Sequence, residues 1–200
     1  NKGFTLMEVM IVLAIMGAMV AMVIPRIGNR NNEIKSEVRK LSTLTRQIRS
    51  LAKLQNVTYR LVLDLGSENQ QSSSYWVERS NNEVLLTEDR EEKYMKSLGN
   101  SADEEQILND PEGFTLDKSL FKSPKKLPSD MTFSSVEITG YEKPLDAGKV
   151  YIHFFPSGRV EEAAIHLKLD DFQWTLAIHP LTGKTDIASQ FVSLKDITNQ

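Results

Sequence analysis

The chain has 200 residues, with 24 Lys or Arg, 27 Asp or Glu, no cysteine and a formal net charge of -3. This length fits one globular domain, or one domain with an appendage. The mild charge gives the chain as a whole none of the strong positive potential that characterises nucleic-acid-binding proteins. Without cysteine, the chain can build neither a disulfide scaffold nor a thiolate metal site.

The stretch GFTLMEVMIVLAIMGAMVAMVIP, residues 3–25, is almost wholly apolar and carries one charge, on Glu8. As a helix, the run from Phe4 to Ile24 would be about 30 Å long, which matches the thickness of a bilayer core. A signal-peptide core is shorter and ends at a small-residue cleavage site, and a buried helix of a soluble protein is rarely apolar all round. The sequence therefore predicts a transmembrane helix over residues 4–25, which lies in lipid or among like helices.

The helical pattern continues beyond this segment with a different character. Gly17 and Pro25 weaken a helix, so we predict a kink or local unwinding at these two residues. Residues 26–56 then carry an apolar stripe at spacings of three and four, formed by Ile34, Val38, Leu41, Leu44, Ile48 and Leu51. Basic residues fill much of the remaining surface, including Arg26, Arg30, Lys35, Arg39, Lys40, Arg46, Arg49 and Lys53. We expect this amphipathic half to lie one-sided on a soluble domain, with its basic residues in solvent or against anionic headgroups or acidic neighbours.

From residue 57 the hydrophobic period changes to two, which indicates β-strands. The predicted strands cover residues 57–65, 75–79, 83–87, 131–139, 149–155, 160–169 and 172–179. Asp170 and Asp171 are predicted to form a two-residue hairpin loop. A long charged insertion covers 87–130, with short helices expected around 91–98 and 102–108. The fold class is therefore α+β, with a long N-terminal helix on an antiparallel sheet or sandwich over residues 57–200.

The N-terminal residues KGFTLMEVMIVLAIMG closely resemble the signature of type IV pilins and of the pseudopilins of type II secretion. The resemblance implies that residues 1–3 are the remnant of a leader peptide, which a prepilin peptidase cuts between Gly3 and Phe4. It also implies that the new N-terminus, on Phe4, is methylated.

Further segments, YWVE, VYIHFFPSGRVEEAAIHLKL and LTGK, resemble the H-type minor pseudopilin group, which includes FimT-like minor pilins. The resemblance implies a pilin-like fold, in which the helix packs on a C-terminal antiparallel β-sandwich. It implies a single-pass protein of the bacterial inner membrane, with its C-terminal domain in the periplasm and incorporated into the pseudopilus. Charge counting would place the basic flank after Ile24 in the cytoplasm, whereas the family exports the C-terminal part, and we follow the family.

The function implied by the resemblance is that of a minor pseudopilin, a structural subunit of the type II secretion pseudopilus that supports protein export across the outer membrane. The implied partners are other major and minor pseudopilins, the prepilin peptidase, the inner-membrane assembly platform and the lipid bilayer, with no cofactor. The alternative is a minor type IV pilin that acts in pilus assembly or DNA uptake. The basic residues from Arg26 to Arg60 favour DNA, but most lie on the helix and the insertion begins acidic, so we do not expect nucleic acid as a partner.

Glu8 requires an explanation, because an ionised carboxylate in hydrocarbon is costly unless it is paired or neutralised. One interpretation is a snorkelling side chain without a specific role, since Glu8 lies about one helical turn from Phe4. The other is subunit assembly, in which Glu8 of one subunit pairs with the α-amino group of Phe4 on the next. Such a contact propagates without closing and so builds filaments. We favour assembly, with Glu8 and Phe4 as the contact residues.

No residue pattern predicts catalysis or metal binding. Three histidines fall in strand patterns: His153, His166 and His179. They lack the i,i+4 spacing of helical metal ligands and the H-E-x-x-H motif. His166 is expected to face solvent with Glu162 and Lys168, while Ile165 and Leu167 face inward. We therefore expect neither an enzyme nor a metal site.

Overall fold

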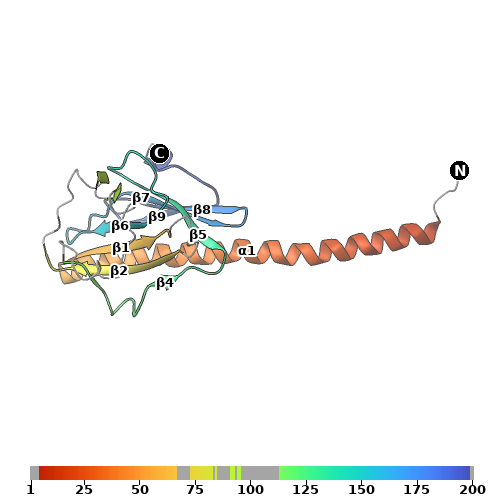
Figure 1. Ribbon diagram of the computed structural model, residues 1–200, viewed down its shortest axis with the longest axis horizontal. Coiled ribbons are helices and arrows are strands. Elements are labelled where there is room, and N and C mark those ends of the chain that lie inside the picture. The colour runs from red at the N-terminus through yellow and green to blue at the C-terminus, as the bar shows by residue number, and fades with distance from the viewer. Residues whose placement is uncertain are drawn as a thin grey trace.

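A computed structural model of the chain describes residues 5–66, 73–82, 84, 91–92, 94–95 and 113–198, with the backbone alone for residues 20–29 and 198. It shows one long helix that carries a β domain at its C-terminal end (Figure 1). The first half of the helix, from Leu6 to the residues just before Arg30, projects away from this domain; we call this part the shaft (Figure 1). The predicted α+β class is confirmed.

Helix α1 spans Leu6–Gln55, so its 50 residues form a rod about 75 Å long. The helix continues without a break through Gly17 and Pro25, and a bend at these residues stays a prediction. Its C-terminal cap is Asn56, in the left-handed conformation at φ 54°, whose backbone N–H donates to Ala52 O. Asparagine tolerates this conformation better than most residues.

Two antiparallel sheets form the domain. The first has the order β3-β2-β1-β6, with β4 also paired to β2; its strands are β1 Thr58–Asp64, β2 Ser74–Ser80, β3 Thr115–Leu116, β4 Lys125–Lys126 and β6 Lys149–Phe154. The second has the order β5-β7-β8-β9, with strands β5 Met131–Ile138, β7 Ala163–Leu169, β8 Phe172–Ile178 and β9 Thr185–Ala188. A short helix, α3 Leu194–Thr198, follows the second sheet.

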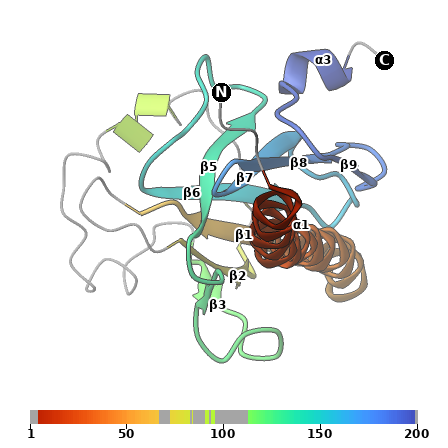
Figure 2. The ribbon, with the colours of Figure 1, turned by 90° about the vertical axis from the view of Figure 1, so that its right-hand side faces the viewer.

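The C-terminal half of α1 packs against both sheets, contacting β1 and β6 of the first and β7 and β8 of the second (Figure 2). The predicted apolar stripe makes this contact, since Ile34, Val38, Leu41 and Ile48 are fully buried in the domain core. The helix is therefore part of the core, and its packed half cannot leave without opening the domain.

The predicted strands near residues 57–65, 75–79, 131–139, 149–155, 160–169 and 172–179 are confirmed. The hairpin at Asp170–Asp171 is also confirmed, because Leu169 pairs directly with Phe172. The predicted strand at 83–87 and the helix at 102–108 lie outside the described residues, except for Val84. The described C-terminal part of the predicted insertion, residues 113–130, supplies two short strands to the first sheet, since β3 and β4 both pair with β2.

The prediction that His166 faces solvent is wrong, because this side chain is fully buried. Ile165 and Leu167 do face the core, so the alternation itself is correct. The outer face of the sheet is covered there by the C-terminal segment, whose Phe191 ring stacks on His166 with 4.3 Å between ring centroids. Lys168 is exposed, two residues further along the same face.

Candidate assembly interface

The shaft of α1 exposes a continuous apolar surface. Ten large apolar side chains between Leu6 and Met19 are each 48–81 % exposed. Monomeric soluble proteins rarely expose apolar patches of such extent, which mark protein or membrane contacts. The shaft therefore needs a covering that this single chain does not provide from its described residues.

The predicted membrane span over residues 4–25 lies only partly within the described residues, because Phe4 and the side chains of residues 20–25 fall outside them. Within the part of the chain that the structure describes, no helix combines the length and the apolar character needed to cross a membrane. Gly3 and Phe4, the predicted cleavage and methylation residues, also lie outside the described part.

Glu8 forms a capping box with Thr5 at the start of α1. The first N–H groups of a helix have no partner within the helix, and a capping box satisfies two of them. Glu8 N donates to Thr5 Oγ1 at 3.3 Å, and Thr5 N donates to Glu8 Oε2 at 3.0 Å. The Thr5 hydroxyl donates to the same Oε2 at 3.0 Å. The carboxylate is thereby held against the first turn of α1.

Only one of the two Glu8 oxygens is used in this cap. Among the described residues, none donates a hydrogen bond to Glu8 Oε1. The side chain is exposed, so a cation from another molecule can approach this oxygen without displacing Thr5. The geometry lets Glu8 cap its own helix and bind a neighbour at the same time. The pattern T-x-x-E, residues 5–8, signals this cap in the sequence, but our sequence analysis did not use it.

Two basic residues of α1 bind the half of the helix from Arg30 onward to the β domain. Arg30 lies 3.3 Å from Asp130 and 3.4 Å from Asp170, measured between nitrogen and carboxylate oxygen. Arg49 donates to the carbonyl oxygens of Gly158 at 2.8 Å and Leu181 at 3.2 Å. These two arginines, expected in solvent or against other molecules, instead bind loops of their own domain.

Each histidine pairs with one carboxylate: His153 with Glu161, His166 with Glu137 and His179 with Asp186. Burial lowers the pKa of His166, an effect that the nearby Glu137 carboxylate opposes. The described residues contain no group of three or more metal-ligating side chains. The three pairs contribute to the β domain and lie apart from the apolar shaft.

A comparison with known protein families finds a known motif in the N-terminal residues. Residues 1–24 match the model of the prokaryotic N-terminal methylation motif, which confirms the predicted signal and supports a type IV pilin-like or pseudopilin-like role. No curated protein sequence matches the chain. Among solved structures, the minor pseudopilin EpsH from the type 2 secretion system of Vibrio cholerae is similar at 11% identity and a TM-score of 0.43, covering 78% of this chain and 97% of that one. The H-type and FimT-like assignment stays a prediction.

Proposed function

We propose that this chain is a minor pseudopilin, a structural subunit that enters a type II secretion pseudopilus through the shaft of α1. The observation that carries the proposal is the combination of a methylation motif over residues 1–24 with a helix whose apolar first half is exposed. The shaft is suited to a bundle of like helices, while the packed second half holds the β domain beside that bundle. The protein works by assembly, without catalysis and without a cofactor.

Assembly is directed by the Glu8 carboxylate. Cleavage after Gly3 creates an ammonium group on Phe4, and Glu8 of an adjacent subunit binds it through the oxygen that Thr5 leaves unused. In a medium of low dielectric constant a mispaired charge is strongly penalised, so the pair also selects the register between helices. Each subunit supplies one partner to each neighbour, which allows a filament to grow.

The proposed setting follows from this role. The precursor lies in the bacterial inner membrane with its β domain in the periplasm, and a prepilin peptidase processes it. Its partners are the lipid bilayer, the inner-membrane assembly platform, and other major and minor pseudopilins.

The test of the assembly mechanism compares Glu8→Ala with Glu8→Gln. Glutamine keeps an oxygen that accepts from Thr5 but carries no charge, so it separates helix capping from ion pairing. We expect both variants to fold and to be cleaved, and both to lose most of their incorporation, measured by crosslinking to neighbouring subunits in the cell envelope. Normal incorporation of Glu8→Gln would overturn the ion-pair mechanism, and normal incorporation of both variants would overturn the role of Glu8.

The choice between a secretion filament and a type IV pilus is tested separately. Crosslinking of the periplasmic domain in its native envelope, followed by identification of the captured proteins, should yield minor pseudopilins. Capture of type IV pilus components instead would favour the alternative, a minor pilin of pilus assembly or DNA uptake.

A further inference from the structure

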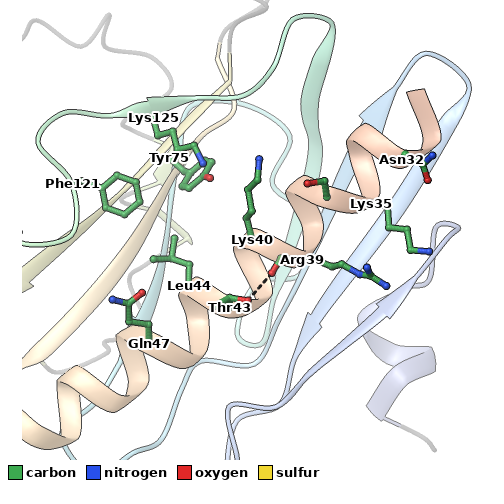
Figure 3. A pocket seen from close by; sticks show the side chains of 11 residues that line it. Asn32, Lys35, Arg39, Lys40, Thr43, Leu44, Gln47, Tyr75, Phe121 and Lys125 are labelled. Carbon is green, nitrogen blue, oxygen red and sulfur yellow. Dashed lines mark hydrogen bonds between the residues drawn. The ribbon is translucent and has the colours of Figure 1, made fainter. Parts of the chain in front are cut away.

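A surface groove of about 630 Å³ runs beside α1, well beyond the apolar shaft (Figure 3). The helix forms one wall with residues from Asn32 to Gln47, and the first sheet with its β3–β4 connection forms the other. Figure 3 shows Lys40 on the helix and Lys125 on the opposite wall, with Tyr75 and Phe121 beside Lys125.

The groove is strongly basic. Its lining includes four cationic side chains, Lys35, Arg39, Lys40 and Lys125. The carboxylate of Glu37 lies beneath them; it is 2 % exposed and lies 2.8 Å from Lys40 and 3.3 Å from Lys125. Among the described residues, no carboxylate lies within ion-pair distance of Lys35 or Arg39. The groove thus keeps two cations available for a ligand.

The groove also has an apolar part. Leu44 from the helix meets Tyr75 and Phe121 from the other wall. The two aromatic rings contact edge to face, with 5.9 Å between centroids, and Phe121 is only partly buried. A ligand can therefore bury an apolar side chain here beside Lys40 and Lys125, and it reaches Arg39 and Lys35 by crossing the exposed face of the helix (Figure 3).

We propose that this groove binds an acidic segment of a neighbouring subunit, with an apolar side chain against Leu44, Tyr75 and Phe121 and carboxylates on Lys35 and Arg39. The side-chain amides of Asn32 and Gln47 line the same wall and offer both donors and acceptors, while the Thr43 hydroxyl donates to Arg39 O at 3.0 Å and offers only its oxygen as an acceptor. A phosphate chain would use the cations alone and would leave the apolar part of the groove uncovered. Assignment to a neighbouring subunit rests on the proposed filament role, whereas peptide binding itself does not.

The chain itself contains a segment of this chemistry. Residues 102–112, ADEEQILNDPE, carry five acidic side chains, the apolar pair Ile107 and Leu108, and no Lys or Arg. This sequence serves as the probe. The host protein is the full chain in detergent micelles with the five acids of its own segment replaced by amides (D103N, E104Q, E105Q, D110N, E112Q), so that it does not compete with the probe.

Binding of the fluorescently labelled peptide is measured by anisotropy at low and high salt. We expect saturable binding that weakens with salt, because the ion pairs are near the surface. The groove variant Lys35→Glu with Arg39→Glu should weaken binding about tenfold or more, since like charges then face each other. The matched control, Arg159→Glu with Lys168→Glu, changes charge equally at exposed positions outside the groove and should bind as the host does.

Two altered peptides complete the test. Replacing the five acids by amides should abolish binding, and replacing Ile107 and Leu108 by serine should weaken it. Equal binding of the acidic and amide peptides, or equal binding by the groove variant and the control, would overturn the proposal. Tighter binding of single-stranded DNA or of phosphatidylglycerol vesicles, lost in the same groove variant, would overturn it in favour of a phosphate ligand. None of these results depends on Glu8 or on filament assembly.

Discussion

The two halves of α1 share one continuous backbone but differ in the burial of their described side chains. From Leu6 to Met19 every large apolar side chain is at least 48 % exposed, whereas Ile34, Leu41 and Ile48 are fully buried. The first half is apolar on all sides and the second half only along one stripe. A helix that is apolar all round requires an apolar environment on every side, and a striped helix requires one core.

This difference separates stability from assembly. The buried stripe contributes to the core of the β domain and hence to its free energy of folding, whereas the exposed shaft contributes little. Substitutions in the shaft should therefore change filament formation and leave the domain intact, while substitutions in the stripe should unfold the domain first. The following variants test that separation, from the largest expected effect to the smallest.

Leu41→Ala should lower the free energy of unfolding by about 2–5 kcal/mol, because it removes a fully buried side chain and leaves a cavity. Leu13→Ala, a substitution of the same chemistry at a side chain that is 63 % exposed, should leave the unfolding midpoint unchanged. Urea unfolding of both proteins in detergent, followed by tryptophan fluorescence, makes the comparison. Equal destabilisation by the two variants would refute the separation of the two halves.

Tyr75→Phe should cost about 1–3 kcal/mol, because it removes the hydroxyl that donates to the buried Glu37 carboxylate at 2.7 Å. The aromatic ring, and hence the core packing, is retained. In a Glu37→Met background the same change should cost much less or should stabilise, since the hydroxyl then has lost its acceptor. An identical cost in both backgrounds, measured by urea unfolding, would show that the hydrogen bond has no role.

Glu37 should also make the packed half sensitive to acid. Burial raises the pKa of this carboxyl, but hydrogen bonds from Lys40 and Tyr75 and the charge of Lys125 outweigh burial, so its pKa lies below the usual range. Its contribution to stability is therefore complete above the unfolded-state pKa of about 4.3 and is lost as the pH falls through the lower folded-state pKa.

This acid sensitivity is measured as the difference in unfolding free energy between the wild type and Glu37→Gln at several pH values. The difference should be largest at pH 7 and should shrink below about pH 5, where the unfolded-state carboxyl begins to bind protons. A difference that is constant from pH 7 to pH 3 would mean that the Glu37 charge contributes nothing.

Thr5→Val should have the smallest effect on the domain. It removes the hydroxyl of the capping box and should loosen the first turn of α1 by about 1 kcal/mol, without moving the unfolding midpoint of the domain. Amide hydrogen exchange at Glu8 should accelerate in Thr5→Val and remain slow in Thr5→Ser, which keeps the hydroxyl. Equally fast exchange in both variants would indicate that the capping box does not hold this turn.

The sequence predicted the apolar stripe and most strands well, because both depend on local periodicity. Glu37 shows what periodicity also offers, since it lies three residues after Ile34 and four before Leu41, on the buried face. That position indicates a buried carboxylate, and our sequence analysis passed over it. Its partners, Tyr75 and Lys125, lie 38 and 88 residues away, and no local pattern identifies them.

His166 and the β3–β4 region show a second limit. Alternation states which residues share a face of a strand, but it does not state what covers that face. The covering of His166 comes from a segment 24 residues later, through Gln190, Phe191 and Val192 around Thr175. Strands β3 and β4 have two residues each, which is too short for any period to appear.

The attachment of α1 at both ends of the domain couples rotation of the shaft to rotation of the domain. Only Asn56 and Val57 separate the helix from β1, and Arg30 binds two loops at the opposite end. One residue advances a helix by about 100° and 1.5 Å. One residue inserted between residues 19 and 30 would therefore turn the domain by about 100° about the shaft. In the proposed filament, the number of residues between Glu8 and Arg30 would thus set the angle about the shaft at which the groove meets a neighbouring subunit.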